Sequence, residues 1–251
     1  MATAAAVLVI VGCATAGRAP APLPVEEGTE PWEMPAAALG TQRLFRVSYD
    51  GPDGDGSFRL TLRLAGADRY QVVAVDPLGR SLWTLDAEAD EGLWIDHRAR
   101  AVCRLTGSFD VVASRLTPFP LAALPSLLLG RLPEPPAAGE EGEPESGVEP
   151  TAGDGRRLDY RDASGRRWTA ILGPAGPRSW SFAEPGDETP SVFWSRAEAG
   201  EAYLSDRLRG VQLRWRETVA EPLAALTPLA APPGFAEVAC DELYPEPLRA
   251  D

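Results

Sequence analysis

A period of two in hydrophobicity runs through many short segments of this chain. In SFRLTLRLA (residues 57–65) every second side chain is apolar, and Phe45, Val47 and Tyr49 alternate with polar residues in the same way just before it. Successive side chains of a β-strand point to opposite faces of a sheet, whereas an α-helix repeats about every 3.6 residues. These segments are therefore predicted to be strands with one apolar face and one polar face.

Similar segments recur along the chain at the spacing of β-hairpins. Short turns rich in Gly, Asp and Pro separate them, such as DGPDGDG at residues 50–56. This regular spacing predicts an antiparallel meander and a mainly β fold with about 10–11 strands. The predicted strands lie at residues 43–49, 57–65, 69–75, 80–85, 92–97, 100–105, 156–162, 165–172, 178–184, 191–199 and 210–218.

The pattern changes between residues 106 and 133, where two helices are predicted, at residues 108–116 and 120–130. Pro125 would bend or restart the second helix, and Gly130 stands in a C-terminal stop position. Four leucines of the second helix fall on one face: Leu121, Leu124, Leu128 and Leu129.

The N-terminus has the features of an export signal. The apolar run from residue 4 to residue 11 is too short for a bilayer core of about 30 Å, but it suits a signal peptide. It ends in Ile-Val-Gly-Cys, which resembles a bacterial lipobox and implies cleavage before Cys13 and lipidation of that residue. Residues 1–12 are thus predicted to be a lipoprotein signal peptide, and residues 13–41 the lipidated cysteine with a flexible tether. The alternative is a chance Gly-Cys pair.

Two cysteines remain once Cys13 carries lipid. An exported protein lies where disulfides persist, and an even remainder suits one bridge between Cys103 and Cys240. The alternative is two separate buried thiols.

One long acidic segment interrupts the strand series. Residues 134–154 hold six Glu and one Asp and no basic residue, so they contribute −7 to the net charge of −13. We interpret residues 134–155 as a flexible acidic insert in a single domain, residues 42–245, followed by a tail at residues 246–251. The alternative is two domains. Because phosphate binding needs clustered Lys and Arg, the charge also argues against a nucleic-acid partner.

The residues that carry catalysis are scarce. His97 is the only histidine, lysine is absent, and no nucleotide-binding or nucleophile-elbow motif occurs. Asp50, Asp53 and Asp55 lack the later glutamate of a calcium loop and are interpreted as a hairpin turn. We therefore expect no enzyme activity, no metal and no cofactor.

One turn breaks the rule that hairpin tips are polar. In DRYQVVAVDPLGRSLWTL (residues 68–85) two predicted strands flank Pro77, Leu78 and Gly79, and a leucine stands at the tip. About 35 residues later comes a proline- and leucine-rich segment, PFPLAALPSLLLGRLP. In order and spacing these elements resemble the outer-membrane lipoprotein receptor (LolB-like) family, within the LolA/LolB lipoprotein-carrier fold.

The resemblance implies an incomplete antiparallel β-barrel of the α+β class, with helices covering its open, apolar side. It implies that the leucine at position 78 projects into solvent and helps to deliver cargo to the membrane. It also implies an apolar cavity. The alternative for the aromatic side chains on strands, which their residue type favours, is a packed core. The residues expected to line the cavity are Leu62, Leu64, Trp83, Trp94, Leu121, Leu124, Leu128, Trp168 and Trp180.

The function expected from this resemblance is acyl-chain binding and delivery. The protein would be a monomer held at the periplasmic face of the outer membrane by its lipid anchor. It would take lipoprotein or lipid cargo, with a soluble periplasmic carrier as a partner. The alternative is a non-catalytic structural or interaction lipoprotein of the cell envelope that keeps the fold without transferring cargo.

Overall fold

The computed structural model describes residues 33–52, 54–106, 124–132, 147–150, 155–161, 165–174, 176–197 and 200–243. Within these residues the chain forms fourteen strands and three short helices. The strands are β1 (Thr41–Gly51), β2 (Gly54–Leu64), β3 (Arg69–Val75), β4 (Ser81–Glu88), β5 (Glu91–Asp96), β6 (Ala101–Thr106), β7 (Gly147–Pro150), β8 (Arg156–Arg161), β9 (Arg167–Gly173), β10 (Gly176–Ala183), β11 (Val192–Arg196), β12 (Glu201–Asp206), β13 (Val211–Pro222) and β14 (Ala236–Glu237). The helices are η1 (Ala36–Ala38), α2 (Leu124–Leu128) and α3 (Cys240–Leu243).

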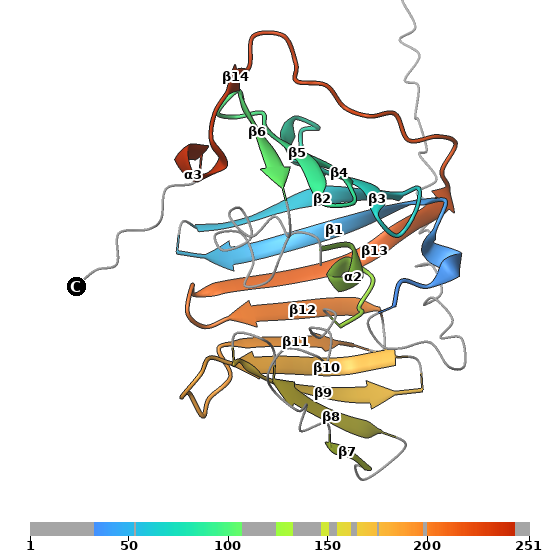
Figure 1. The fold of residues 1–251 in the computed structure, drawn as a ribbon, viewed down its shortest axis with the longest axis vertical. Coiled ribbons are helices and arrows are strands. Elements are labelled where there is room, and N and C mark those ends of the chain that lie inside the picture. Colours follow the sequence, from blue (N-terminus) through green and yellow to red (C-terminus); the bar gives the residue numbers. More distant parts are fainter. Residues whose placement is uncertain are drawn as a thin grey trace, which may run out of the picture.

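All fourteen strands belong to one curved sheet with the order β14-β6-β5-β4-β3-β2-β1-β13-β12-β11-β10-β9-β8-β7 (Figure 1). Every pairing is antiparallel except that of β14 with β6. The sheet is open, because β14 and β7 are its two ends. The predicted incomplete antiparallel barrel is confirmed, with more strands than the expected 10–11.

The pairing of β1 with β13 joins the two halves of the chain into this one sheet. β1 pairs with β2 on one side and with β13 on the other, so that Val47 faces Phe58 and Trp215. The ladder between β1 and β13 has a register shift between Leu44 and Phe45. Strands far apart in sequence thus become neighbours at the centre of the sheet.

The inner face of the sheet, defined by its buried apolar side chains, carries a continuous core. The period of two puts Phe45 and Val47 of β1 and Leu60, Leu62 and Leu64 of β2 on this face, each at most 5% exposed. In the other half of the sheet the aromatic rings of Trp168, Trp180 and Trp194 form a row, with neighbouring centroids 5.6 and 5.9 Å apart. One hydrophobic cluster contains all of these residues.

The outer face is covered from β3 to β6 by the segment that follows β13, which Figure 1 shows as a long arch leading to β14. Two buried polar side chains of the outer face bind its backbone. Gln71 Nε2 donates to the Thr227 carbonyl at 2.6 Å, and Asp86 Oδ2 accepts from the Leu229 N–H at 2.7 Å. These bonds explain why Gln71 and Asp86 are buried on the face that alternation predicts to be wet.

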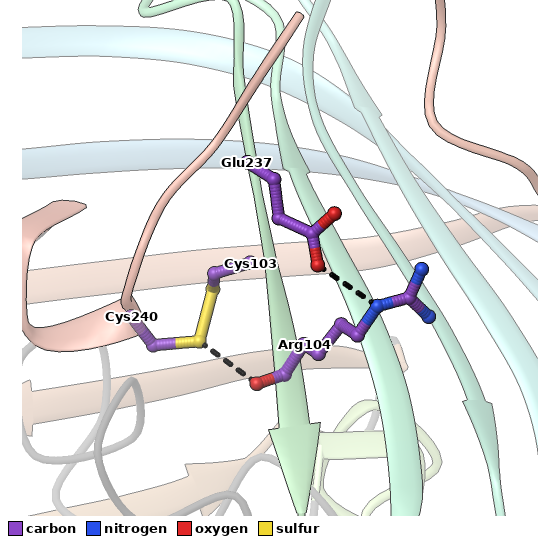
Figure 2. Close-up of a disulfide and its surroundings, with 4 residues drawn as sticks. All are labelled: Cys103, Arg104, Glu237 and Cys240. Carbon is purple, nitrogen blue, oxygen red and sulfur yellow. Dashed lines mark hydrogen bonds and ion pairs between the residues drawn. A yellow bond between two sulfur atoms is a disulfide. The ribbon is translucent and has the colours of Figure 1, made fainter.

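A disulfide holds the far end of this segment. Cys103 of β6 and Cys240 of α3 are bonded, with their Cα atoms 5.1 Å apart (Figure 2). Next to the bridge, Arg104 Nε lies 3.0 Å from Glu237 Oε1. The structure therefore contains the predicted bridge and not two separate thiols.

The end of α2 has the hydrogen bonds of a Schellman motif. The Arg131 N–H donates to the Ser126 carbonyl at 2.7 Å, and the Gly130 N–H donates to the Leu127 carbonyl at 2.9 Å. Gly130 has φ +70°, a conformation that glycine adopts without strain. The predicted stop at Gly130 is confirmed. The described part of the second predicted helix begins at Leu124, and the first predicted helix lies outside the described residues.

Two predicted boundaries differ from the structure, and the predicted segments at the two ends of the chain lie outside the described residues. Residues 147–150, predicted as part of the flexible insert, form β7, because β8 offers an unpaired edge to which their backbone adds. Met34 and Ala38, predicted as tether, pack against the core because both are apolar. The signal peptide and Cys13 lie outside the described residues, as do residues 246–251.

Candidate functional site

The turn between β3 and β4 holds a leucine in solvent. Its backbone closes through a hydrogen bond from the Gly79 N–H to the Asp76 carbonyl at 2.9 Å, and Gly79 has φ +83°. Asp76 Oδ1 accepts from the N–H groups of Leu78 and Arg80, both at 2.9 Å. Pro77 restricts φ at the position before the tip. In this frame the Leu78 side chain is 79% exposed, the highest value among the large apolar residues described.

A pocket of about 940 Å³ opens beside this turn. Tyr49, Phe58 and Trp83, inner-face side chains of β1, β2 and β4, form its apolar wall, and Leu78 contributes to its lining. Trp83 stacks on Trp94 with ring centroids 4.8 Å apart, so the wall continues into the core. The volume lies in the range of small-molecule sites, about 300–1,000 Å³.

The titratable side chains of Asp76, Arg80, His97 and Arg98 also line this pocket. The Arg80 N–H lowers the pKa of Asp76 below its ordinary value, and the Arg80 side chain, with Nε 2.6 Å from Asp76 Oδ2, adds to the effect. The carboxylate therefore stays ionised at neutral pH and keeps the turn in place. The pocket thus combines an apolar wall with a polar rim.

Most of the residues predicted to line a cavity belong to the core cluster instead. The structure places Leu62, Leu64, Trp94, Leu124, Leu128, Trp168 and Trp180 in that cluster, each at most 8% exposed. Of the predicted set, Trp83 is the member that lines the pocket beside Leu78, and Leu121 lies outside the described residues. Bulky side chains on facing strands fill the space between them, which favours the packed-core alternative for these positions.

Tyr49 and Phe58 are pocket residues that the sequence did not single out. Both take part in the period-two pattern, so their face was predictable. Their position at the end of the inner face comes from the register of the hairpin between β1 and β2, in which Tyr49 faces Gly56 and Val47 faces Phe58. Gly56 lines the pocket together with Tyr49.

A cluster of charged side chains lies on the inner face, at the ends of the strands that are opposite to the pocket. Arg43 is 4% exposed, and its Nη1 lies 2.8 Å from Glu217 Oε1. Burial raises the pKa of Glu217, and the charge of Arg43 opposes this shift. Arg196 Nη2 donates to the Leu129 carbonyl at 2.7 Å, which ties the end of α2 to the sheet. Sequence alternation predicts apolar residues here, so these charges are exceptions to the pattern.

Two kinds of feature are absent from the described residues. In the described residues, no three His, Cys, Asp or Glu side chains gather closely enough to hold a metal ion. No helix within the same part of the chain has the length and apolar character needed to span a bilayer.

Comparison with known proteins identifies the fold. No family model matches the chain, and no curated protein sequence matches it. A LolA superfamily protein from Nitrosomonas europaea superposes with a TM-score of 0.50 at 11% sequence identity, covering 76% of this chain and 88% of that chain. At this identity the likeness shows the fold alone, an open curved antiparallel sheet like that of the LolA superfamily.

Two more solved structures are similar at lower scores. A putative outer membrane lipoprotein-sorting protein domain from Vibrio parahaemolyticus has a TM-score of 0.46 at 9% identity, covering 74% of this chain and 86% of its own. A DUF1329 family protein from Desulfovibrio piger has a TM-score of 0.46 at 10% identity, covering 76% and 89%.

Proposed function

We propose that this chain is a LolB-like, lipid-anchored lipoprotein on the periplasmic face of the outer membrane, which binds acyl chains of lipoproteins or lipids and helps to deliver them to that membrane. The anchor is Cys13, and no catalytic step is involved. The protein acts as a monomer and takes cargo from a soluble periplasmic carrier. The observation that carries the proposal is the rigid turn that presents Leu78 to solvent beside an apolar pocket.

The physical basis is the transfer of apolar surface out of water. An acyl chain gains about 25 cal/mol for each Å² that it buries against an apolar wall such as that of Tyr49, Phe58 and Trp83. Inserting Leu78 into the bilayer surface adds roughly 1.5–3 kcal/mol. This contribution orients the pocket toward the membrane but does not anchor the protein. The acyl chains on Cys13 provide the anchor.

Replacing Leu78 tests this role. We expect Leu78→Glu to slow transfer of a fluorescent triacylated lipopeptide to vesicles of phosphatidylethanolamine and phosphatidylglycerol at least about tenfold, because a charge is excluded from the apolar region of the bilayer. The amount of lipopeptide bound before transfer should fall by much less than the transfer rate, since Leu78 is 79% exposed and contributes only part of the pocket lining. Fluorescence transfer measures the rate, and native mass spectrometry measures the loading.

Leu208 supplies a matched control. It is 60% exposed, and Asp206 accepts a hydrogen bond from its N–H, as Asp76 does for Leu78. Its turn joins β12 to β13 and lies at the same end of the sheet, because Asp206 pairs with Val211 and Asp50 with Gln212. Leu208 does not line the pocket beside Leu78. Leu208→Glu should transfer at the wild-type rate; if Leu78→Glu also does, and no lipid or lipoprotein co-purifies with the wild type, the proposal is wrong.

One observation favours the structural or interaction lipoprotein as a second candidate. The aromatic row of Trp168, Trp180 and Trp194 is almost fully buried in the core, so an acyl chain reaches it only by displacing side chains that pack there. A protein of this kind would bind no lipopeptide in the loading measurement and would co-purify with envelope proteins instead.

A further inference from the structure

Two arginines lie at the end of α2, and one of them has a guanidinium nitrogen without a hydrogen-bond partner among the described residues. Arg131 is 3% exposed, and its Nη1 atom is fully buried without a hydrogen-bond partner in the part of the chain that the structure describes. Arg131 follows Gly130 in the Schellman motif, at the position where an apolar side chain usually packs back on the helix. A buried cation therefore stands where the local fold calls for a hydrophobic residue.

Arg196 reaches the same place from the sheet. It is the last residue of β11, and its guanidinium packs so closely over Gly130 that a β-carbon there would collide with it. Burial lowers the pKa of Arg196, and the nearby charge of Arg131 lowers it further, while Glu217 opposes the shift. Burial alone lowers the pKa of Arg131. The two guanidinium groups therefore lie close enough to repel each other.

The nearby acid does not balance this charge. Glu217 is already paired with Arg43 at 2.8 Å and also interacts with Arg196, so among the described residues this one carboxylate faces two guanidinium groups. Arginine stays protonated in proteins, so it cannot escape the cost of burial by losing its charge. A buried ion without a partner is strongly destabilising, and an oxyanion between Arg131 and Arg196 would remove that penalty.

The surroundings indicate what the anion is attached to. The Arg196 guanidinium lies 6.0 Å from the ring of Trp194, and Trp194 stacks on Trp180 at 5.9 Å. The two arginines thus stand at the end of an apolar aromatic row. A ligand that suits both features carries one negatively charged group and an apolar chain.

We propose that Arg131 and Arg196 bind the oxyanion head group, a carboxylate or a phosphate, of an amphiphile whose chain lies against the inner face. The chain part of this inference rests on the acyl binding proposed above. On binding, Arg196 exchanges the neutral Leu129 carbonyl for a charged oxygen, and charge-assisted hydrogen bonds are about twice as strong as neutral ones. The preferred cargo is therefore an acidic amphiphile, and a neutral acyl chain binds more weakly.

A comparison of acid and ester tests the site on the wild-type full chain after removal of co-purified lipid. We expect palmitate to bind at least about tenfold more tightly than methyl palmitate by tryptophan fluorescence and calorimetry. The Arg131→Met and Arg196→Met variants should lose this preference. Arg216→Met is the matched control, because Arg216 is exposed on the outer face of β13, and it should keep the preference.

Thermal unfolding without ligand separates a binding role from a structural one. Removing an unpaired buried charge should raise the midpoint of Arg131→Met above that of the wild type, whereas loss of a structural arginine would lower it. A lower midpoint would overturn the proposal even if the variant binds poorly.

The outcomes distinguish this inference from the proposed function. Equal affinity of the wild type for palmitate and methyl palmitate overturns the anion site and leaves acyl binding intact. If inorganic phosphate binds in an Arg131-dependent way and neither amphiphile binds, the anion site stands and the proposed function fails. If none of the three probes binds, both are wrong.

Discussion

At the scale of single residues, two aspartates set the turns that present leucines to solvent. Asp76 Oδ1 accepts from the N–H groups of Leu78 and Arg80, and Asp206 Oδ1 accepts from those of Leu208 and the following residue. Such side-chain bonds replace backbone ones in tight turns, so the tip residue is free to be apolar. The difference between the two leucines is the pocket that borders the first.

The single histidine connects stability to pH. His97 Nε2 lies 3.1 Å from the Thr84 hydroxyl, and its ring meets Phe235 edge-on with centroids 5.8 Å apart. Burial lowers the pKa of His97 below its ordinary value of 6.5, and the charge of Asp96 opposes this shift. The unfolded chain therefore takes up a proton at a higher pH than the folded chain. Stability should fall as the pH drops through 6.5 toward the lowered pKa, and recover as it rises.

Thermal unfolding between about pH 7.5 and pH 5 measures this dependence. We expect the midpoint of the wild type to drop over that interval by more than the midpoint of His97→Gln, which cannot titrate. Since the chain contains one histidine, the difference between the two curves belongs to this side chain. Parallel curves would show that His97 does not contribute.

At the scale of elements, the segment after β13 acts as a cover for the outer face of β3 to β6. It is held by Gln71 and Asp86 in the middle, by the parallel pairing of Ala236 with Ala101, and by the disulfide at its end. Each contact alone is small, because a net hydrogen bond contributes about 0.5–1.5 kcal/mol. The covalent bond is therefore expected to carry most of the attachment.

Reducing the disulfide should release this segment without unfolding the sheet. The bridge spans 137 residues, and closing so long a loop stabilises by roughly 2–5 kcal/mol in the chain-entropy model. We expect the amides of Ala236 and Val238 to lose protection from hydrogen exchange, because they donate to Arg100 and Val102 of the sheet. Hydrogen exchange with mass spectrometry, with and without reductant, measures this.

The ion pair beside the bridge provides the control for this experiment. Arg104 and Glu237 are both exposed, so Arg104→Ala should cost less than about 1 kcal/mol and leave the protection of Ala236 and Val238 unchanged. Full protection in the reduced wild type would mean that the hydrogen bonds alone hold the segment.

At the scale of the whole molecule, stability centres on the junction of β1 and β13. Trp215 is 4% exposed, lies opposite Val47, and donates from Nε1 to the Leu128 carbonyl at 3.4 Å. Trp215 therefore connects β13, to which it belongs, with β1 and α2. Because the two halves of the chain meet here, they should unfold together.

The Trp215→Ala variant tests this cooperativity. We expect it to lower the free energy of unfolding by about 3–5 kcal/mol, the usual cost of truncating a buried tryptophan, and to keep a single transition. Circular dichroism and tryptophan fluorescence should report the same midpoint. Arg216→Ala, one residue on and exposed, should change stability by no more than about 0.5 kcal/mol. Two separate transitions would instead support two domains.

Local features of this protein were predictable from its sequence. The strands followed from the period of two, because alternation depends only on neighbouring residues and on the geometry of the extended chain. The stop at Gly130 and the turn at Pro77, Leu78 and Gly79 followed from residues that favour those backbone conformations. The antiparallel strands and the turn that carries Leu78 were therefore predictable from local residues, whereas the open barrel and the exposure of Leu78 were implied by the family resemblance.

Contacts between distant residues were decided by the tertiary structure. Only the pairing of β1 with β13 brings Arg43 to Glu217, and only the path of residues 129–131 brings Arg131 to Arg196. A sequence does not distinguish an arginine that will be buried from one that will face water, because burial depends on what the rest of the chain places over it. For the same reason the tryptophans expected to line a cavity lie in the core, and the pocket lies at the end of the strands beside Leu78. Packing fills the space that the facing strands leave.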